Sequence, residues 1–273
     1  MAVNRATRSD LLRTPPGAAV AIQNRVWHID QKPLHRAFLA TARSRPRGDT
    51  LGSRPRCVKL AVHHVQQLGA ADDSADHGFR FAEGERINRF RKPLDRAHAN
   101  LAERMVFHMQ NRETYMKGPV ARDARGRPGL TGTDIRADFN LSHHAGWVAL
   151  AWTAEGKVGV DLARAGEASE RAGRYVCSPQ EWEYCVRLSG VRRQRFLSLV
   201  WAVKEAYAKA VGTGVHRGLK DLGFVPAHLE RGEAVAESPG LVNWQFNLGE
   251  VQPGLFIAVA SDSPYRLQPV NLL

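Results

Sequence analysis

Two stretches of the sequence, residues 139–164 and 201–214, hold the residue types that phosphate and hard-metal chemistry requires. Carboxylates bind a divalent cation such as Mg²⁺, and hydroxyl and basic groups bind phosphate oxygens. The two stretches supply both kinds of group, in the order Ser142, His143, Asp161, Glu205 and Lys209. The other elements of the chain must therefore bring these two stretches together.

Short strands are predicted around the first group. The segment DFNLSHHAGWVALAWT gives one strand that ends near Ser142-His143 and a second strand over 147–153, and KVGVDLA gives a third that runs into Asp161. Because short turns join these strands, we expect antiparallel pairing. One carboxylate at a strand end and a second on a neighbouring helix would leave most of an octahedral Mg²⁺ shell open for substrate phosphate.

The second group lies on the clearest helix of the sequence, predicted over about 192–211. Apolar residues recur there at helical spacing, and Gly212 supplies a C-terminal stop. Trp201, Glu205 and Lys209 share the opposite face at i, i+4 and i+8. A tryptophan in the middle of that face indicates that the face is covered or lines a cleft, which makes Glu205 and Lys209 site candidates. The alternative is a solvated i,i+4 ion pair.

The remaining elements are predicted from periodicity and capping signals. Pro93 divides a basic helical stretch over 81–116, and Ser178 with Pro179 and Glu181 gives a capped helix start. We expect further strands over 58–68, 241–249 and 254–261, and a tail over 262–273.

The net charge of +12 is unevenly distributed along the chain. Residues 1–57 contain eleven Arg or Lys and three acids, whereas the remaining 216 residues contain 28 basic and 24 acidic residues. The basic, proline-containing segment predicts a flexible N-terminal extension. An organelle transit peptide, or a start codon assigned too early, would give the same composition. Only this extension favours a nucleic-acid interaction, because the rest of the chain is nearly balanced in charge.

Several protein classes are excluded by the sequence. No apolar run approaches the roughly 18–20 residues that cross a bilayer, and no Walker loop, dinucleotide fingerprint, zinc spacing or G-x-S-x-G motif is present. Cys57, Cys177 and Cys185 are odd in number and lack metal-ligand spacing. They favour free thiols in a reducing compartment, so we expect a cytoplasmic location.

The order and spacing of four motifs resemble one family, the Sfp-type 4′-phosphopantetheinyl transferases. The motifs are Gly126-Arg127-Pro128, FNLSHH at 139–144, GVDLAR at 159–164, and WAVKEAYAK at 201–209 with GTG shortly after. The family patterns have the forms G-K-P, F-N-x-S-H-S, G-[IV]-D-[IL]-E and W-x-x-K-E-[AS]-x-x-K. Arg89 and Phe90, followed by Asp95, are similar to the first half of the family, so the resemblance covers about residues 58–261.

The resemblance implies an α+β, pseudo-dimeric fold of two similar halves in one chain, with coenzyme A bound in the cleft between them. The halves would span 58–135 and 136–273, and the second would carry the metal site. The implied reaction is the Mg²⁺-dependent transfer of 4′-phosphopantetheine from coenzyme A to a serine of an apo acyl or peptidyl carrier protein. Adenosine 3′,5′-bisphosphate would be the leaving group, and the enzyme would act as a monomer. The pathway of the carrier protein stays open.

Residue roles follow from the same resemblance. Asp161 and Glu205 are implied to bind Mg²⁺ on the pyrophosphate, with Glu205 or a metal-bound water deprotonating the incoming serine. Lys209 is implied to stabilise charge on the transferring phosphate. The residues implied to hold the nucleotide are Arg127, Ser142 and His143, with Arg86, His98 and Arg104 as candidates for its 3′-phosphate.

Three positions depart from the family patterns. Ala163 stands where the third acid is usual, Arg127 replaces the usual lysine, and His144 replaces a serine. The missing acid predicts a weaker metal site in which water replaces one ligand, and arginine keeps the charge but changes the geometry. Two alternative interpretations are a family member that binds coenzyme A or a carrier protein without turnover, and a basic nucleic-acid-binding protein.

Overall fold

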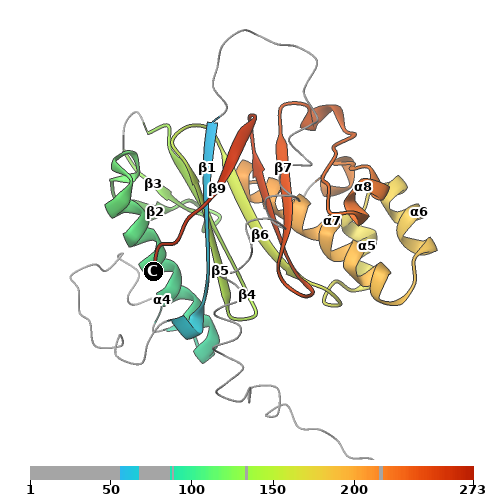
Figure 1. Cartoon of the computed structure of the whole chain (residues 1–273), viewed down its shortest axis with the longest axis horizontal. Helices are drawn as coiled ribbons and strands as arrows, with labels where there is room; N and C mark the ends of the chain where they lie inside the picture. Colours follow the sequence, from blue (N-terminus) through green and yellow to red (C-terminus); the bar gives the residue numbers. More distant parts are fainter. Residues whose placement is uncertain (1–55, 68–86, 88, 133–134, 215–217) are drawn as a thin grey trace, which may run out of the picture.

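The computed structural model of the chain describes residues 56–67, 87, 89–132, 135–214 and 218–273. Arg86 and the proposed N-terminal extension, apart from Arg56 and Cys57, lie outside these residues. Two main sheets organise the described part. The first sheet has the strand order β4-β5-β1-β9, the second sheet has the order β6-β8-β7, and β2 and β3 form a separate hairpin. With helices packed on both sheets, the α+β class is confirmed (Figure 1).

The bounds of the elements, in chain order, are β1 Arg56–His64, η2 Val65–Gln67, α4 Pro93–Arg112, η3 Thr114–Met116, β2 Val120–Arg122, β3 Pro128–Leu130, β4 Asp138–His144, β5 Trp147–Thr153, β6 Val158–Arg164, α5 Glu170–Val176, α6 Pro179–Arg187, α7 Gly190–Val211, η4 Leu219–Asp221, α8 Pro226–Glu230, η5 Pro239–Leu241, β7 Gln245–Gln252, β8 Leu255–Ser261 and β9 Tyr265–Pro269. The predicted helix over 192–211 is thus confirmed as α7, which begins two residues earlier. No described helix is long and apolar enough to cross a membrane.

The elements stack in four layers, with α4 on one outer face and α5 to α8 on the other (Figure 1). Strand β5 shows why both faces of the first sheet are buried. Its alternate residues Val148, Leu150 and Trp152 pack in the cluster that contains α4, whereas Trp147, Ala149 and Ala151 pack against the second sheet. This period of two follows from the strand geometry. A continuous apolar run therefore marks an interior strand.

The alternate residues of strand β8 likewise pack on the two faces of the second sheet. Leu255, Ile257 and Val259 face the first sheet, whereas Phe256 and Ala258 face α7 and its neighbouring helices. The second sheet therefore lies between the first sheet and the helical layer, and α7 is covered along most of its length.

The two sheets meet at their edge strands, β4 and β6, through side chains rather than through backbone pairing. Asp138, Asn140 and Ser142 project from β4 at a spacing of two residues. Their oxygens accept hydrogen bonds from the backbone N–H groups of Val158, Val160 and Leu162 at 3.0, 3.0 and 3.1 Å. These β6 groups face the edge that β8 does not occupy. We call this arrangement the β4–β6 joint.

Gly159 allows α7 to approach β6 closely. A Cβ atom built at Gly159 would lie 1.9 Å from the carbonyl oxygen of Ala206 and 2.6 Å from the backbone nitrogen of Ala210. No side chain fits there without displacing the helix backbone. Gly159 therefore fixes the distance between the strand that carries Asp161 and the helix that carries Glu205.

The predicted capping box at Ser178 is confirmed, and it continues into a buried ion pair. The Ser178 hydroxyl accepts from Glu181 N, and the Glu181 carboxylate accepts from Ser178 N. The same carboxylate pairs with Lys204 of α7 and accepts from Phe224 N at 2.9 Å. Burial lowers the pKa of Lys204, while Glu181 opposes that shift. This pair joins α6, α7 and the segment before α8.

The predicted division into two halves at residues 135 and 136 stays a prediction. Among the described residues, the first sheet combines strands from both sides of this position, because β4 and β5 pair with β1 and β9 returns to it. The sheets divide after Thr153. Whether the two halves are similar stays a prediction.

The pairing of the three consecutive strands was only partly predicted. β4 and β5 are antiparallel as expected, but β6 pairs with β8 because its two faces are buried by the first sheet and by α7.

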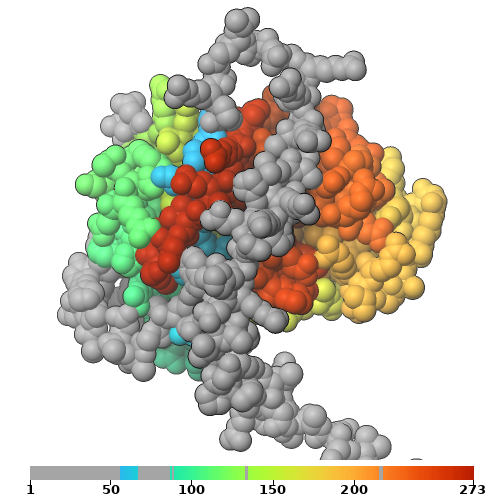
Figure 2. Space-filling view, in the orientation of Figure 1, coloured from blue at the N-terminus to red at the C-terminus, as the bar shows by residue number. Residues whose placement is uncertain are grey.

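The predicted C-terminal tail is a strand. β9 pairs in parallel with β1, and the buried Tyr265 hydroxyl donates to Val259 O at 3.1 Å. Figure 2 shows the C-terminal segment in red across the front of the molecule, between α4 and the helix-rich side. The predicted strand over 241–249 also begins later, at Gln245, because the residues before it form the short helix η5.

We expect Lys204→Met to lower the free energy of unfolding by about 3–5 kcal/mol, because it leaves the buried Glu181 carboxylate without its cation. Adding Glu181→Gln should recover part of that loss, since the double variant carries no unpaired buried charge. Urea unfolding at pH 7 measures both, with the exposed Lys220→Met as the control. Equal stability of Lys204→Met and the control would contradict the proposed role of the pair.

Candidate active site at the β4–β6 joint

The site is centred on Asp161, whose side chain lies between β4 and α7. Asp161 Oδ1 accepts from Lys209 Nζ at 2.6 Å and from the Ser142 hydroxyl at 3.0 Å. Lys209 Nζ also donates to Ser142 Oγ at 3.0 Å and to Val160 O at 3.3 Å. Three residues predicted from separate motifs are therefore joined in one hydrogen-bonded cluster.

Glu205 lies one helical turn before Lys209 and is 8% exposed. Burial, and then the neighbouring Asp161 carboxylate, raise the pKa of Glu205 to about 7, while Lys209 lowers it. Two carboxylates and one lysine thus share this region. The alternative prediction, a solvated i,i+4 ion pair between Glu205 and Lys209, is wrong, because Lys209 Nζ pairs with Asp161.

The two carboxylates fit a divalent cation in part. Asp161 Oδ2 is buried and has no hydrogen-bond partner, and a buried carboxylate oxygen without a partner is costly. The like charge of Asp161 and Glu205 would be relieved by a cation. No cluster of three or more acidic, His or Cys ligands occurs among the described residues. Asp161 and Glu205 could therefore hold Mg²⁺ only with ligands from water or substrate.

Ala163 explains why no third acid contributes. It lies two residues after Asp161 on the same face of β6, and its side chain is buried in the apolar cluster formed with α7. The missing third acid is therefore a real difference in the site, and not the result of aligning the motif at the wrong residue.

His143 and His98 stack at the turn between β4 and β5, with ring centroids 4.7 Å apart. His98 Nε2 accepts from Gly146 N at 3.0 Å, so the neutral ring carries its proton on Nδ1, which is buried without a partner. Burial and the positive field of His143 lower the pKa of His98 to about 4. The role predicted for His98, a contact to the 3′-phosphate, stays a prediction.

His143 differs from His98 in exposure. Its side chain is exposed, while partial burial and then the charge of Lys209 lower its pKa. The exposed imidazole is accessible to a ligand near Lys209.

Arg127 is occupied by protein groups. Its Nη2 atom donates to both oxygens of Asp138, at 2.9 and 2.8 Å, and its Nε atom donates to Lys209 O at 2.9 Å. Arg127 therefore contacts the backbone of the site lysine, while Arg104 on α4 is only half-buried and Arg86 lies outside the described residues. The roles predicted for Arg86 and Arg104 stay predictions.

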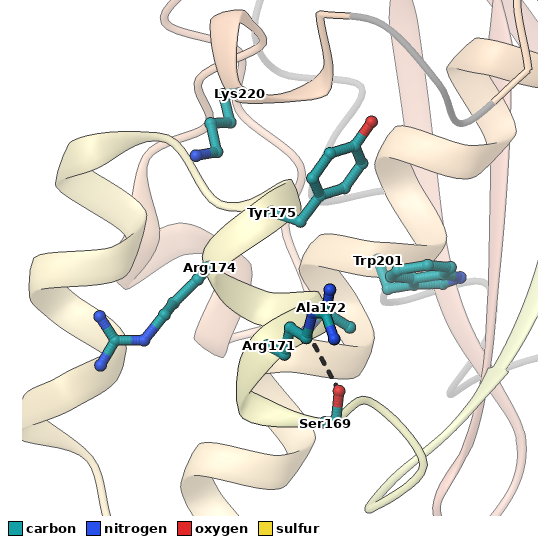
Figure 3. A pocket seen from close by; sticks show the side chains of 7 residues that line it. All are labelled: Ser169, Arg171, Ala172, Arg174, Tyr175, Trp201 and Lys220. Carbon is teal, nitrogen blue, oxygen red and sulfur yellow. Dashed lines mark hydrogen bonds between the residues drawn. The ribbon is translucent and has the colours of Figure 1, made fainter.

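A hollow of about 500 Å³ lies beside the site, on the α7 face that carries Trp201. Figure 3 shows the residues that line it, with Trp201 on α7, Arg171 and Tyr175 on the neighbouring helix α5, and Lys220 on a separate segment. Trp201 precedes Glu205 by one turn, so the hollow and Glu205 lie along one helix face. This agrees with the prediction that the Trp201 face lines a cleft.

Sequence reasoning missed several residues of this region. Asp138 and Asn140 were not singled out, although their alternation with Ser142 could have indicated one polar strand face. Arg171 and Tyr175 lie on the short helix α5, which was not predicted. Its Ser169 N-cap was the available signal.

Residues 157–260 match the family described as the 4′-phosphopantetheinyl transferase superfamily. A phosphopantetheinyl transferase from Thraustochytrium sp. is 30% identical over 188 residues, which are 62% of this chain and 64% of that protein. The L-aminoadipate-semialdehyde dehydrogenase-phosphopantetheinyl transferase of Mus musculus is 26% identical over 67% of this chain and 66% of its own length.

Shorter matches are also found. A holo-[acyl-carrier-protein] synthase from Streptococcus thermophilus is 43% identical over 60 residues, which are 22% of this chain and 50% of that protein. The chain thus spans less than two thirds of the Thraustochytrium and Streptococcus relatives. The match over 157–260 contains β6, α7 and β8, and with them Asp161, Glu205 and Lys209. Through this region, the chain is similar to the 4′-phosphopantetheinyl transferase superfamily.

Proposed function

We propose that the protein transfers the 4′-phosphopantetheine arm of coenzyme A to a serine hydroxyl of an apo carrier protein. The observation that carries this proposal is the cluster of Asp161, Lys209 and Ser142 beside Glu205, within the part of the chain that matches the superfamily. The serine oxygen would form a bond to the β-phosphorus of coenzyme A. The bond from that phosphorus to the bridging oxygen would break, and adenosine 3′,5′-bisphosphate would leave.

The chain's own residues have distinct parts in this reaction. Lys209 would donate to a non-bridging phosphate oxygen. To do so it would give up its weakest present contact, the 3.3 Å hydrogen bond to Val160 O. Without a bound ion, the pKa of Glu205 is raised to about 7. Glu205, or a water held by a metal ion, would accept the serine proton. A Mg²⁺ ion bound by Asp161 and Glu205 would neutralise charge on the pyrophosphate.

The exposed His143 side chain near Lys209 is our proposed contact for the nucleotide side of coenzyme A. Ser142 would act mainly by holding Lys209 and Asp161, since its hydroxyl already contacts both. Cys57, Cys177 and Cys185 are free thiols, which supports our proposal of a cytoplasmic enzyme. We also propose that it acts as a monomer.

The hollow beside Trp201 is our proposed docking surface for the carrier protein. Arg171 and Lys220 are exposed at its rim, without an acidic partner among the described residues, and Tyr175 adds a half-exposed aromatic ring. Basic and aromatic side chains at a rim suit an acidic protein surface. Trp201 in its lining precedes Glu205 by one helical turn, so we propose that a docked serine would approach the carboxylates along this face of α7.

Intact mass spectrometry tests the reaction. An apo carrier protein incubated with this protein, coenzyme A and Mg²⁺ should gain the mass of phosphopantetheine. Asp161→Asn and Lys209→Met should each lower the rate by about 100-fold or more, the effect typical of removing one preorganised charged group at a transition state. Arg136→Gln, far out on the surface, serves as the control.

A different result would redirect the interpretation. Coenzyme A binding without mass gain, across fatty-acid, polyketide and peptidyl carrier proteins, would indicate a family member without turnover. Restoration of turnover by Ala163→Glu would then assign the loss to the missing third acid.

Glu205 should make stability depend on pH. Its folded pKa of about 7 exceeds the ordinary 4.5, so the ionised form is less favourable in the folded than in the unfolded protein. The resulting cost is absent below about pH 4.5, grows as pH rises, and is complete above about pH 7, where it amounts to roughly 3 kcal/mol. We expect Glu205→Gln to be more stable than the parent protein at pH 8 and equally stable near pH 4.5, by urea unfolding.

The same urea unfolding measurement in the presence of Mg²⁺ tests whether Glu205 binds the ion. If Glu205 and Asp161 bind the ion, adding Mg²⁺ at pH 8 should stabilise the parent protein and leave Glu205→Gln nearly unchanged. Equal stabilisation of both proteins by Mg²⁺ would count against Glu205 as a ligand.

Docking at the hollow predicts a selective kinetic change. Arg171→Glu combined with Lys220→Glu should raise KM for an acidic carrier protein by about tenfold and leave KM for coenzyme A within about twofold, because rim charges act on association. Arg136→Glu, the same charge reversal elsewhere, should change neither constant. An unchanged carrier KM in the double variant would exclude this surface.

A further inference from the structure

The hairpin formed by β2 and β3 reaches the end of α7 with two arginine side chains. Arg125 Nη1 donates to Gly212 O, and Arg127 Nε donates to Lys209 O at 2.9 Å. The turn that carries them is ordered by Asp123, whose Oδ1 atom accepts from the backbone nitrogens of Arg125 and Arg127, both at 2.9 Å. The hairpin therefore presents both guanidinium groups to the helix in a fixed geometry.

The end of α7 leaves the carbonyl of Lys209 available. In a continued helix, Lys209 O would accept from the backbone nitrogen of Thr213. Gly212 instead adopts a left-handed conformation, with a φ of 76°, and both Gly212 N and Thr213 N donate to Ala208 O. Lys209 O is thus an orphan acceptor of the last turn, where the helix dipole favours a cation. Arg127 supplies both the hydrogen-bond donor and the positive charge.

The other end of the Arg127 guanidinium holds the β4–β6 joint. Nη2 contacts both oxygens of Asp138 and also Val158 O at 3.2 Å. Asp138 is the first residue of the joint and itself accepts from Val158 N. Arg127 therefore links the start of β4, the start of β6 and the end of α7, and its side chain is only 16% exposed.

We propose that Arg127 is a positioning residue for Lys209, and not a phosphate contact. This inference rests on the proposed function, in which Lys209 stabilises the transferring phosphate. Arg127 fixes the backbone of Lys209 against the strand that carries Asp161, so that Lys209 Nζ lies within reach of both Asp161 and the substrate. An arginine suits this role because Nε and Nη2 act in two directions from one rigid plane, which a lysine cannot do.

The two roles predict different kinetics. A phosphate contact made equally in ground and transition states would act on KM for coenzyme A, whereas misplacement of Lys209 would act on kcat. For Arg127→Gln and Arg127→Lys we expect kcat to fall by about tenfold or more, the value for one charge-assisted hydrogen bond. KM for coenzyme A should change by less than about threefold. Asp138→Asn, which keeps the Nε contact to Lys209, should have a smaller effect on kcat.

Hydrogen exchange supplies a readout that does not need turnover. Peptides covering residues 205–213 should exchange faster in Arg127→Gln and Arg127→Lys than in the Arg136→Gln control, and thermal stabilisation by coenzyme A should be retained in all three. If the parent protein lacks transferase activity, the proposed function fails, and exchange in 205–213 alone decides the positioning role.

Two results would overturn the inference. One is unchanged exchange over 205–213 in both Arg127 variants. The other is an Arg127→Lys variant with normal kcat while Arg127→Gln has an about tenfold higher KM for coenzyme A, because charge alone would then be sufficient. If Arg127→Gln does not fold, the same measurements on Arg127→Lys and Asp138→Asn test the inference.

Discussion

The structure depends on three side-chain hydrogen bonds between two sheet edges. An edge strand presents unpaired N–H and C=O groups that must find partners when they are buried. In β6 the N–H groups are satisfied by Asp138, Asn140 and Ser142 of β4, and the carbonyls of Val158 and Val160 accept from Arg127 and Lys209. Side chains rather than backbone therefore join the two sheets, and this places polar groups at their junction.

The same constraint explains where the candidate site lies. Ser142 accepts from Leu162 N in the joint and donates to Asp161 in the site, so one hydroxyl serves both the fold and the chemistry. Lys209 likewise satisfies an edge carbonyl and pairs with Asp161. Because Gly159 sets how closely α7 approaches β6, small changes in packing there would move Glu205 and Lys209 relative to Asp161. Site geometry and sheet joining cannot vary independently.

The local elements were more predictable from sequence than their pairing. The helix α7, the Ser178 capping box and the association of Ser142 with Asp161 and Lys209 follow from periodicity, caps and motif spacing. The pairing of β6 with β8 in a second sheet, rather than with β5, does not follow from these signals, because short turns favour pairing with the preceding strand. Only the burial of β6 on both faces overrides that preference. The sequence context of Arg127 does not reveal its contact with the orphan carbonyl at the end of α7. The burial of His98 likewise depends on the tertiary packing of α4, which the sequence does not show.

Charge balance links metal binding to protonation in this site. Asp161 has Lys209 as its cation, while the raised pKa of Glu205 favours a proton on that carboxyl near neutral pH. A divalent cation bound by both carboxylates must displace that proton and compete with the Lys209 contact. Because Ala163 is packed in the core, the described residues supply no third acid that could offset the loss of this proton and of the Lys209 contact. A pyrophosphate that brings its own negative oxygens would supply the missing ligands and draw Lys209 away from Asp161. Metal and substrate are therefore expected to bind together more favourably than either alone.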